Sequence, residues 1–287
     1  LELGGKAANI VFDDAPIDQA VEGIVNGIFF NQGHVCCAGS RLLVQESIAE
    51  EVLSKLKVRL KSLRTGDPLD KNTDVGAINS QAQLDRIREL VACGVAEGAD
   101  LYQPACKLPE KGFYFPPTLF SNVAMSHRIA RDEIFGPVLS ILTFRTPEEA
   151  VEKANNTRYG LSAGVWTDKG SRILKMSTEL KAGVVWANSF NKFDPASPFG
   201  GYKESGFGRE GGREGLYEYL IADWIKNAPA AKPEKISIPL ASTSPVQTSS
   251  SGIDRTAKLY IGGKQARPDS GYSYSVTSAK GKVIGQA

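Results

Sequence analysis

The residues from 9 to 44, NIVFDDAPIDQAVEGIVNGIFFNQGHVCCAGSRLLV, set the architecture that we expect of this chain. They open with an apolar run over 9–12, which is short enough to be a buried strand. Apolar side chains then recur at helical spacing over 17–30, and residues 42–44 return to a strand pattern. A strand, a helix and a second strand in this order form the unit from which parallel sheets are built.

The same alternation continues as far as Trp186. Helices are predicted over 50–63, 81–97, 147–154 and 172–180, and strands over 138–144, 163–167 and 183–186. The fold is therefore predicted to be α/β, with a mainly parallel twisted sheet and flanking helices.

Charge and apolar content exclude several classes of protein. The 287 residues include 34 Lys and Arg against 32 Asp and Glu, a net charge of +2, which argues against nucleic-acid and membrane-surface partners. No apolar run approaches the roughly 20 residues of a membrane span. Four cysteines are too few for a disulfide framework and favour a reducing compartment, so we expect a cytoplasmic protein.

The composition changes near Asn227. Nine of the twenty residues over 237–256 are Ser or Thr, a composition that buries too little apolar surface to fold. We predict a catalytic lobe over 1–226, a disordered linker over 227–257 and the start of a second unit over 258–287. Strands are expected in that last part over 258–264 and 272–276, and a flexible tail is the alternative.

A thiol lies in a glycine-flanked turn directly after the first helix. Gly33 and Gly39 enclose Cys36, and glycines let a backbone approach a ligand closely and direct N–H groups at it. A single cysteine is more often buried and inert, so the turn alone does not identify a nucleophile. The two histidines of the chain are too few for a cluster of metal ligands, and no metal is expected.

Eight motifs in order resemble those of the aldehyde dehydrogenase superfamily, over roughly residues 1 to 225. They lie at 1–6, 31–41, 66–69, 112–118, 133–137, 155–161, 183–188 and 198–209. The resemblance implies the catalytic domain of that fold, with the NAD-binding half mostly absent. The Ser/Thr-rich linker and the strands after it are similar to the tandem family 16 members.

The resemblance implies a role for two residues in chemistry. Cys36, third after Gly33, matches the family's nucleophile, and Glu2 matches its general base. The implied reaction is the oxidation of an aldehyde to a carboxylic acid through a thiohemiacetal and a thioester on the cysteine, with NAD or NADP as the cofactor.

Four further positions match cofactor-binding residues of the family. Glu133 corresponds to the carboxylate that binds the nicotinamide ribose, and Phe135 to the aromatic residue at the same end. Gln83 and Arg86 resemble positions near the adenosine end. The upstream residues that distinguish NAD from NADP are not in this sequence, so the choice stays open.

Two aromatic residues and one histidine complete the candidate site. Phe190 and Phe193 follow the last predicted strand, where the family lines its aldehyde tunnel, and packing in the core is the alternative for both. His34 stands where the family usually has Gln, and an imidazole titrates near neutral pH whereas an amide does not.

The resemblance implies a small-molecule aldehyde as the substrate, a homo-oligomer as the full-length protein and little activity in the isolated fragment. Two other functions stay open. One is a scaffold or interaction protein that keeps the fold with weak catalysis. The other is a thiol-dependent esterase that uses Cys36 and Glu2 without a cofactor.

Overall fold

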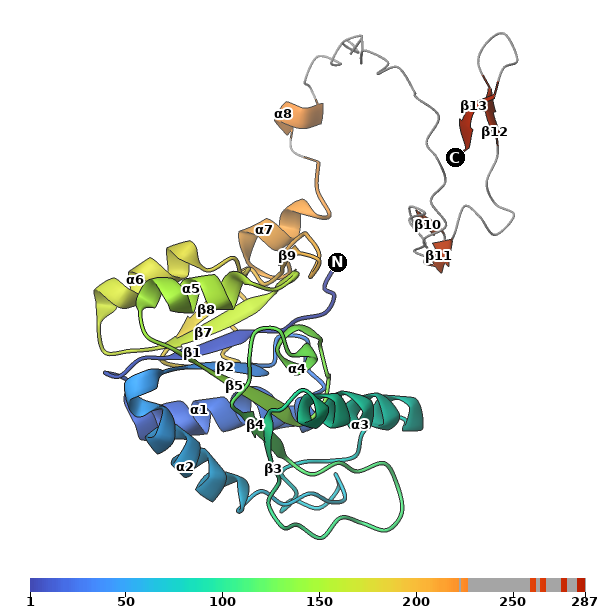
Figure 1. The fold of residues 1–287 in the computed structure, drawn as a ribbon. Helices are drawn as coiled ribbons and strands as arrows, with labels where there is room; N and C mark the ends of the chain where they lie inside the picture. The colour runs from blue at the N-terminus through green and yellow to red at the C-terminus, as the bar shows by residue number, and fades with distance from the viewer. Residues whose placement is uncertain (222, 227–258, 262–263, 267–274, 278–282, 287) are drawn as a thin grey trace. The chain divides into compact units, whose positions relative to one another are not determined.

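The computed structural model describes residues 1–221 and 223–226, and in the tail 259–261, 264–266, 275–277 and 283–286. The chain divides by its internal contacts into two units, Leu1–Ala228 and Pro229–Ala287 (Figure 1). The predicted linker over 227–257 lies outside the described residues, so its disorder stays a prediction.

The first unit is built on a seven-stranded sheet of order β3-β4-β5-β2-β1-β7-β8. Every neighbouring pair is parallel except β3 and β4, which are antiparallel. The strands are β1 (Ala8–Val11), β2 (Arg41–Gln45), β3 (Asp100–Tyr102), β4 (Thr118–Ser121), β5 (Val138–Phe144), β7 (Ser162–Trp166) and β8 (Val184–Ala187). The prediction of an α/β fold with a mainly parallel sheet is confirmed.

Helices cover both faces of this sheet (Figure 1). One face packs against α1 (Ile17–Phe29) and α2 (Ala49–Leu60) through one apolar cluster. The other face packs against α3 (Gln81–Ala96), α4 (Arg128–Arg131), α5 (Pro147–Asn155) and α6 (Gly170–Glu179) through a second cluster. Alternate residues of β1 supply the two clusters: Ile10 belongs to one and Val11 to the other, both fully buried. A central strand buried on both faces reads as a continuous apolar run, as residues 9–12 do.

Several short elements were not predicted, among them β3, β4 and α4. A two-stranded sheet joins β6 (Tyr159–Gly160) to β9 (Tyr202–Lys203), and α7 (Gly212–Tyr217) and α8 (Asp223–Lys226) close the unit. The 3₁₀ segments η1 (Phe30–Gly33) and η2 (Glu46–Ile48) precede β2 and α2. The longer helices begin and end within three residues of their predicted bounds.

The second unit contains two antiparallel pairs. They are β10 (Leu259–Ile261) with β11 (Lys264–Ala266), and β12 (Ser275–Thr277) with β13 (Val283–Gln286). β10 lies within the first strand predicted for this part, and β12 overlaps the end of the second.

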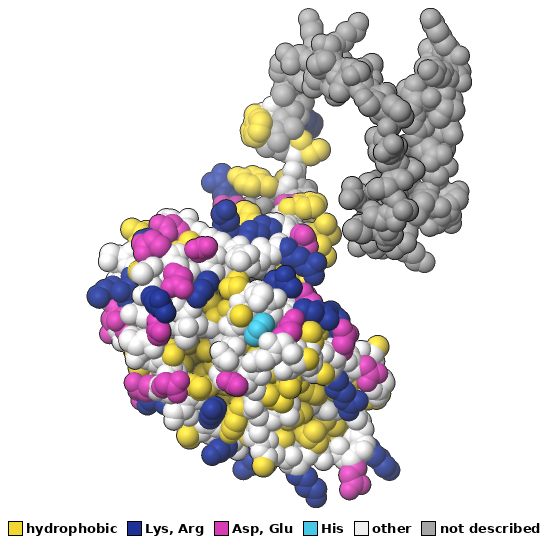
Figure 2. Space-filling view, in the orientation of Figure 1, with side chains coloured by type: hydrophobic (Ala, Val, Ile, Leu, Met, Phe, Trp, Pro, Cys, Tyr) yellow, Lys and Arg dark blue, Asp and Glu magenta, His cyan; other side chains and the backbone are white. Residues whose placement is uncertain are grey.

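The surface carries charges of both signs, intermixed over the face seen in Figure 2. Large apolar side chains stand exposed near α7 and α8, among them Leu216, Tyr219 and Trp224. Within the part of the chain that the structure describes, no helix is long and apolar enough to cross a membrane.

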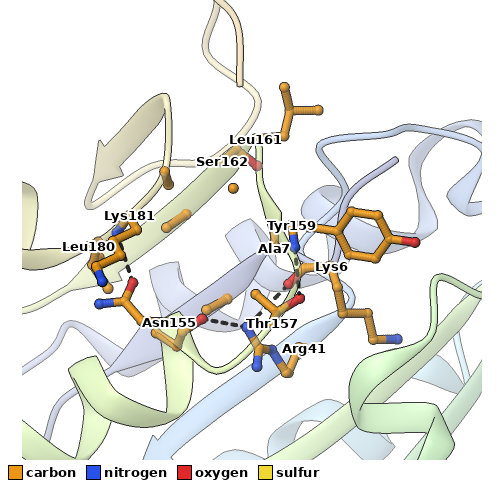
Figure 3. Close-up of a pocket in the computed structure, with 15 residues that line it drawn as sticks. Lys6, Ala7, Arg41, Asn155, Thr157, Tyr159, Leu161, Ser162, Leu180 and Lys181 are labelled. Atoms are coloured by element: carbon orange, nitrogen blue, oxygen red, sulfur yellow. Dashed lines mark hydrogen bonds between the residues drawn. The ribbon is translucent and has the colours of Figure 1, made fainter. Parts of the chain in front are cut away.

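Arg41 joins three elements beneath the site. Its buried guanidinium donates to the carbonyl oxygens of Ala154, near the end of α5, and of Lys6, before β1, at 2.7 and 3.3 Å (Figure 3). It also donates to the carbonyl oxygen of Lys153 at 2.9 Å. The two carbonyls of α5 lie in its last turn, where no later helical N–H can reach them, so a buried cation satisfies them. The cavity beside Arg41 measures about 20 Å³, which is room for a water molecule and not for a substrate.

Lys6 is buried next to this guanidinium. It is 1% exposed, and its Nζ has no hydrogen-bond partner among the described residues. Figure 3 shows its side chain extending to the same side as that of Tyr159, away from Asn155 and Lys181. Burial, followed by the charge of Arg41, lowers the pKa of Lys6 to about 7.

Candidate active site

Three segments that lead into adjacent parallel strands form the site. Glu2 precedes β1, Cys36 precedes β2 and Glu133 precedes β5, and these strands are neighbours in the order β5-β2-β1. Because parallel strands begin at the same edge of a sheet, the three side chains meet there. They share a cavity of about 490 Å³ lined by Glu2, Leu3, Gly4, Cys36, Gln83, Arg86, Glu133, Ile134 and Phe135.

Two glycines carry the Glu2 segment through this crowded point. A Cβ on Gly5 would overlap the carbonyl oxygen of Cys36, and one on Gly4 would overlap the carboxylate of Glu133. The backbone N–H of Gly5 instead donates to Glu133 Oε1 at 2.9 Å. The glycines are thus needed for close approach, which places Glu2 at the same cavity as the thiol.

The turn that presents Cys36 has an unusual backbone. Asn31 and Gln32 both have φ of 48°, and Gly33 has φ of 75°. A Cβ on Gly33 would overlap the carbonyl oxygen of Gly136, so the turn presses directly on the loop before β5. Left-handed non-glycine residues cost of order 1–3 kcal/mol each and persist where the surrounding structure holds them. Here the turn is held by its contact with the loop before β5, which forms part of the cavity wall.

The Cys36 thiol is prepared to ionise. The side-chain hydrogen bond from Cys37 is the largest cause that lowers its pKa to about 7, backbone N–H groups of Cys36 and Cys37 act in the same direction, and burial opposes them. The hydrogen bond to Cys36, with burial, raises the pKa of Cys37, so Cys37 keeps the proton. This lowered pKa favours ionisation of Cys36 near neutral pH, and the thiolate is the nucleophilic form.

Glu2 has a second carboxylate as its neighbour. Burial raises its pKa, and so does the charge of Glu210 together with a side-chain hydrogen bond to it. A carboxylate whose pKa is raised is a better general base near neutral pH. Glu210 was missed in the sequence, where the quoted motif ends one residue earlier at Arg209. A second acidic residue near the proposed base is visible only in the fold.

Glu133 and Phe135 precede β5, and Glu2 precedes β1. In the sheet, β2, which follows the Cys36 turn, lies between these two strands. Burial raises the pKa of Glu133, whereas the Gly5 N–H and then the charge of Lys6 lower it. Phe135 has φ of 54°, a left-handed conformation that turns its ring into the cavity lining. The ring stacks on the imidazole of His34, with centroids 5.1 Å apart and an interplanar angle of 13°.

Gln83 and Arg86, on α3, line the same cavity as Cys36. Gln83 Nε2 donates to the carbonyl oxygens of Ile134 and Phe135 at 2.9 and 3.0 Å, so Gln83 anchors the loop before β5. Arg86 donates to Glu89 at 2.8 Å on the exposed side of the helix. Both residues thus stand beside Glu133 and Phe135, and their contact with the adenosine end of a cofactor stays a prediction.

The two phenylalanines after β8 differ in their surroundings. Phe190 is 4% exposed, and its ring lies where side chains at Gly27, Gly39 and Gly164 would otherwise be. Phe193 is 57% exposed and makes an edge contact with Trp186. Both line a separate, larger cavity of about 840 Å³ that also reaches Val35, next to the thiol. Phe190 is thus packed behind the Cys36 turn, and contact of Phe193 with a substrate stays a prediction.

Within the described ranges, no three side chains of the His, Cys, Asp and Glu types converge to hold an ion. All four cysteines are free. The cavity around Cys36 offers its thiol, the carboxylates of Glu2 and Glu133, the ring of Phe135, and the side chains of Gln83 and Arg86.

Comparisons with known proteins identify the family of this chain. Residues 1–225 match the model of the aldehyde dehydrogenase family. The chain is 49% identical over 219 residues to human retinal dehydrogenase 2, covering 76% of this chain and 42% of that protein. It is 46% identical over 219 residues to an aldehyde dehydrogenase of Davidiella tassiana, covering 76% of this chain and 44% of the relative. The chain thus spans less than half the length of these relatives.

Solved structures give the same answer. The NAD-dependent aldehyde dehydrogenase of Sinorhizobium meliloti superimposes with a TM-score of 0.74 at 45% identity, over 76% of this chain and 44% of that one. Betaine aldehyde dehydrogenase of Staphylococcus aureus, in complex with NAD⁺, gives 0.74 at 40% identity, over 77% and 45%. A tandem organisation stays a prediction. With the fold, the order of motifs and the relatives in agreement, the chain belongs to the aldehyde dehydrogenase family.

Proposed function

We propose that this chain is the catalytic part of an NAD-dependent aldehyde dehydrogenase, with Cys36 as the nucleophile and Glu2 as the general base. The observation that carries the proposal is that a thiol with a pKa of about 7 shares one cavity with Glu2 and Glu133. The relatives that are named as aldehyde dehydrogenases, and the neighbours solved with NAD⁺, support the same activity.

The donor set of the cavity fits the ribosyl end of a nicotinamide cofactor. Glu133 offers a carboxylate whose Oε1 already accepts from Gly5, and it can accept further hydrogen bonds from vicinal hydroxyl groups. Phe135 offers an aromatic face in the same wall. When bound, the cofactor supplies the hydride acceptor that allows a thiohemiacetal on Cys36 to become a thioester.

Cys36 begins the reaction. Its thiolate attacks the aldehyde carbon, a C–S bond forms, and the carbonyl π electrons move to the oxygen. The backbone N–H groups of Cys36 and Cys37, which lower the pKa of the Cys36 thiol, are also candidate donors to that developing charge. The turn thus stabilises negative charge first on the thiolate sulfur and then on the former carbonyl oxygen of the aldehyde.

Glu2 completes the reaction. It accepts a proton from a water molecule, whose oxygen attacks the thioester carbon, and the C–S bond breaks to release a carboxylic acid and the Cys36 thiolate. The raised pKa of Glu2 suits this role, because a base that is too weak holds the proton poorly. Glu210, beside Glu2, raises that pKa further.

Steady-state kinetics of the full-length protein with NAD⁺ and a panel of aldehydes test the proposal. Cys36→Ala should lose cofactor reduction entirely. Glu2→Gln should still acylate Cys36 and show a stoichiometric burst of reduced cofactor followed by turnover slowed by about 10²–10⁴-fold. Cys106→Ala, at a partly buried thiol far along the chain, is the matched control. Activity that survives in Cys36→Ala would remove the proposal.

The esterase alternative uses the same thiolate and base, so the assay includes an arm without NAD⁺. An activated ester is given to the protein and to Cys36→Ala. Ester turnover with no aldehyde oxidation in any arm would favour the esterase. If the folded, unsubstituted protein shows neither reaction, the scaffold function is favoured.

A further inference from the structure

His34 lies between three segments that surround the cavity. It ends the strained turn that leads to Cys36, and its ring stacks on Phe135. Its Nδ1 is 2.8 Å from the carbonyl oxygen of Phe135, and the backbone N–H of Asn79 donates to its Nε2 at 3.3 Å. The segments before β2, β5 and α3 are therefore all attached to one side chain.

These two contacts determine the protonation of the ring. A carbonyl oxygen only accepts, so Nδ1 must carry a proton, and an N–H only donates, so Nε2 must have a free lone pair. Only the neutral imidazole with its proton on Nδ1 satisfies both partners. In the imidazolium form, Nε2–H would point at the Asn79 N–H, and that hydrogen bond would be lost.

The backbone of His34 also closes its own turn. The backbone N–H of His34 donates to the carbonyl oxygen of Asn31 at 2.9 Å, and Asn31 Nδ2 donates to the carbonyl oxygen of His34 at 3.1 Å. The neighbouring Gly33 presses on Gly136. A shift of the imidazole away from Phe135 would therefore move both walls of the cavity.

We propose that His34 is the positioning residue that fixes the Cys36 turn against the Phe135 loop, and that it does so only as the neutral imidazole protonated on Nδ1. This rests on the proposed function for the role of Cys36. It deepens that function by making the attachment of the Cys36 turn to the Phe135 loop dependent on pH.

Burial lowers the pKa of His34 from its ordinary value of 6.5, and the hydrogen bond to Phe135 acts in the opposite direction. The titratable groups on the packed segments are Cys36 and Cys37 in the turn, and Asp132 and Glu133 before β5. None of them contributes to the pKa of His34, and neither does a charged group of α3. The ring therefore stays neutral through pH 7, and the turn is released only in acid, below pH 6.5.

A glutamine variant provides the decisive comparison. In His34→Gln, the amide can donate to the Phe135 carbonyl and accept from the Asn79 N–H at every pH. It therefore keeps the hold without titrating. His34→Ala removes both hydrogen bonds, and His127→Gln removes the other histidine of the chain as the matched control.

The first measurement is the rate at which iodoacetamide alkylates Cys36, followed by mass spectrometry from about pH 5.5 to 8. The ratio of the parent rate to the His34→Gln rate cancels the titration of the thiol itself. We expect a ratio near one at pH 7 and above, and a fall of about threefold or more at the acid end, because release of the turn withdraws N–H groups from the thiolate. A ratio that is constant with pH, or the same change in His127→Gln, would overturn the proposal.

The second measurement is the ¹⁵N chemical shift of the imidazole. With two histidines in the chain, His127→Gln assigns the His34 signals directly. We expect a protonated Nδ1 and an unprotonated Nε2 at neutral pH, and the opposite tautomer would overturn the proposal even if His34→Ala fails to fold. Neither measurement uses a cofactor, so a failed dehydrogenase assay leaves this test intact.

Discussion

The backbone N–H of Gly5 donates a 2.9 Å hydrogen bond to the carboxylate of Glu133, 128 residues further along the chain. This bond joins the segment of the proposed base to the segment of the proposed cofactor site, and a Cβ on Gly5 would overlap the carbonyl oxygen of Cys36. The position allows no side chain, because the overlapping atom belongs to the backbone and cannot turn aside.

Gly5→Ala should therefore destabilise the fold and slow the alkylation of Cys36. We expect a loss of about 1–3 kcal/mol in the free energy of unfolding, the usual effect of overpacking, measured by urea denaturation. Gly170→Ala is the control, since a Cβ there meets nothing within 4 Å. If the two variants have equal free energies of unfolding, the structure accommodates a Cβ at Gly5 without loss of stability, and the prediction is wrong.

Cys37→Ala should raise the pKa of Cys36 toward its ordinary value of 9.0, because the hydrogen bond from Cys37 is the largest cause of its lowering. The thiolate fraction at pH 7 should fall by about tenfold or more for a shift beyond one unit. The pH dependence of Cys36 alkylation measures this directly. Cys93→Ala serves as the control, and an unchanged profile in Cys37→Ala would assign the low pKa to the backbone N–H groups alone.

Phe190→Ala and Phe193→Ala should separate packing from substrate contact. Phe190 is buried against three glycines, so its truncation leaves a cavity and should cost about 3–5 kcal/mol. Phe193 is 57% exposed, and its truncation should change stability by less than about 1 kcal/mol while raising KM for aldehydes. Urea denaturation and steady-state kinetics give the two readouts, and the reverse pattern would contradict the assignment.

Lys6→Met should change how stability depends on pH. The unfolded chain holds the Lys6 proton up to its ordinary pKa of 10.5, whereas the folded chain releases it at about 7. Folding is therefore opposed below 10.5 and most strongly below 7, so the free energy of unfolding of the parent rises with pH across this interval. Lys6→Met should be more stable than the parent at pH 7, by about 1–4 kcal/mol, and the gain should shrink toward pH 10.

Lys71→Met, at an exposed lysine, is the control for this experiment. Denaturation of the three proteins at several pH values gives the comparison. A gain in Lys6→Met that is the same at pH 7 and pH 10 would show that the buried ammonium is not the cause.

The long elements could be predicted from the sequence because their apolar residues repeat over many positions. The strand over 138–144 is found at its predicted bounds as β5. The helix predicted over 17–30 ends one residue early at Phe29, since Asn31 and Gln32 beyond it take left-handed conformations that no apolar pattern reveals. The pair β6 and β9 was missed because its partners are two residues long and far apart in the chain.

The candidate site residues were proposed from sequence motifs, but the motifs did not show that these residues lie close together in the fold. Nothing in the spacing of Glu2, Cys36 and Glu133 shows that β5, β2 and β1 are neighbours. Glu210 was missed for the same reason, since its importance comes only from its position beside Glu2. The surroundings of Phe190 depend on glycines from three different elements, so an aromatic residue after a strand could be read equally well as core or as tunnel.

The order of the strands also bears on how the Cys36 turn forms during synthesis. The Cys36 turn is synthesised long before the loop that precedes β5. In the folded chain, Gly33 of the turn packs against Gly136 of that loop, and His34 bonds to the carbonyl oxygen of Phe135. Until β5 docks beside β2, the turn lacks its contacts with Gly136 and Phe135, and only the local hydrogen bonds between Asn31 and His34 close it. We therefore expect the nascent chain to present Cys36 in a turn that lacks these two contacts, and the turn to reach its final geometry only after β5 has docked.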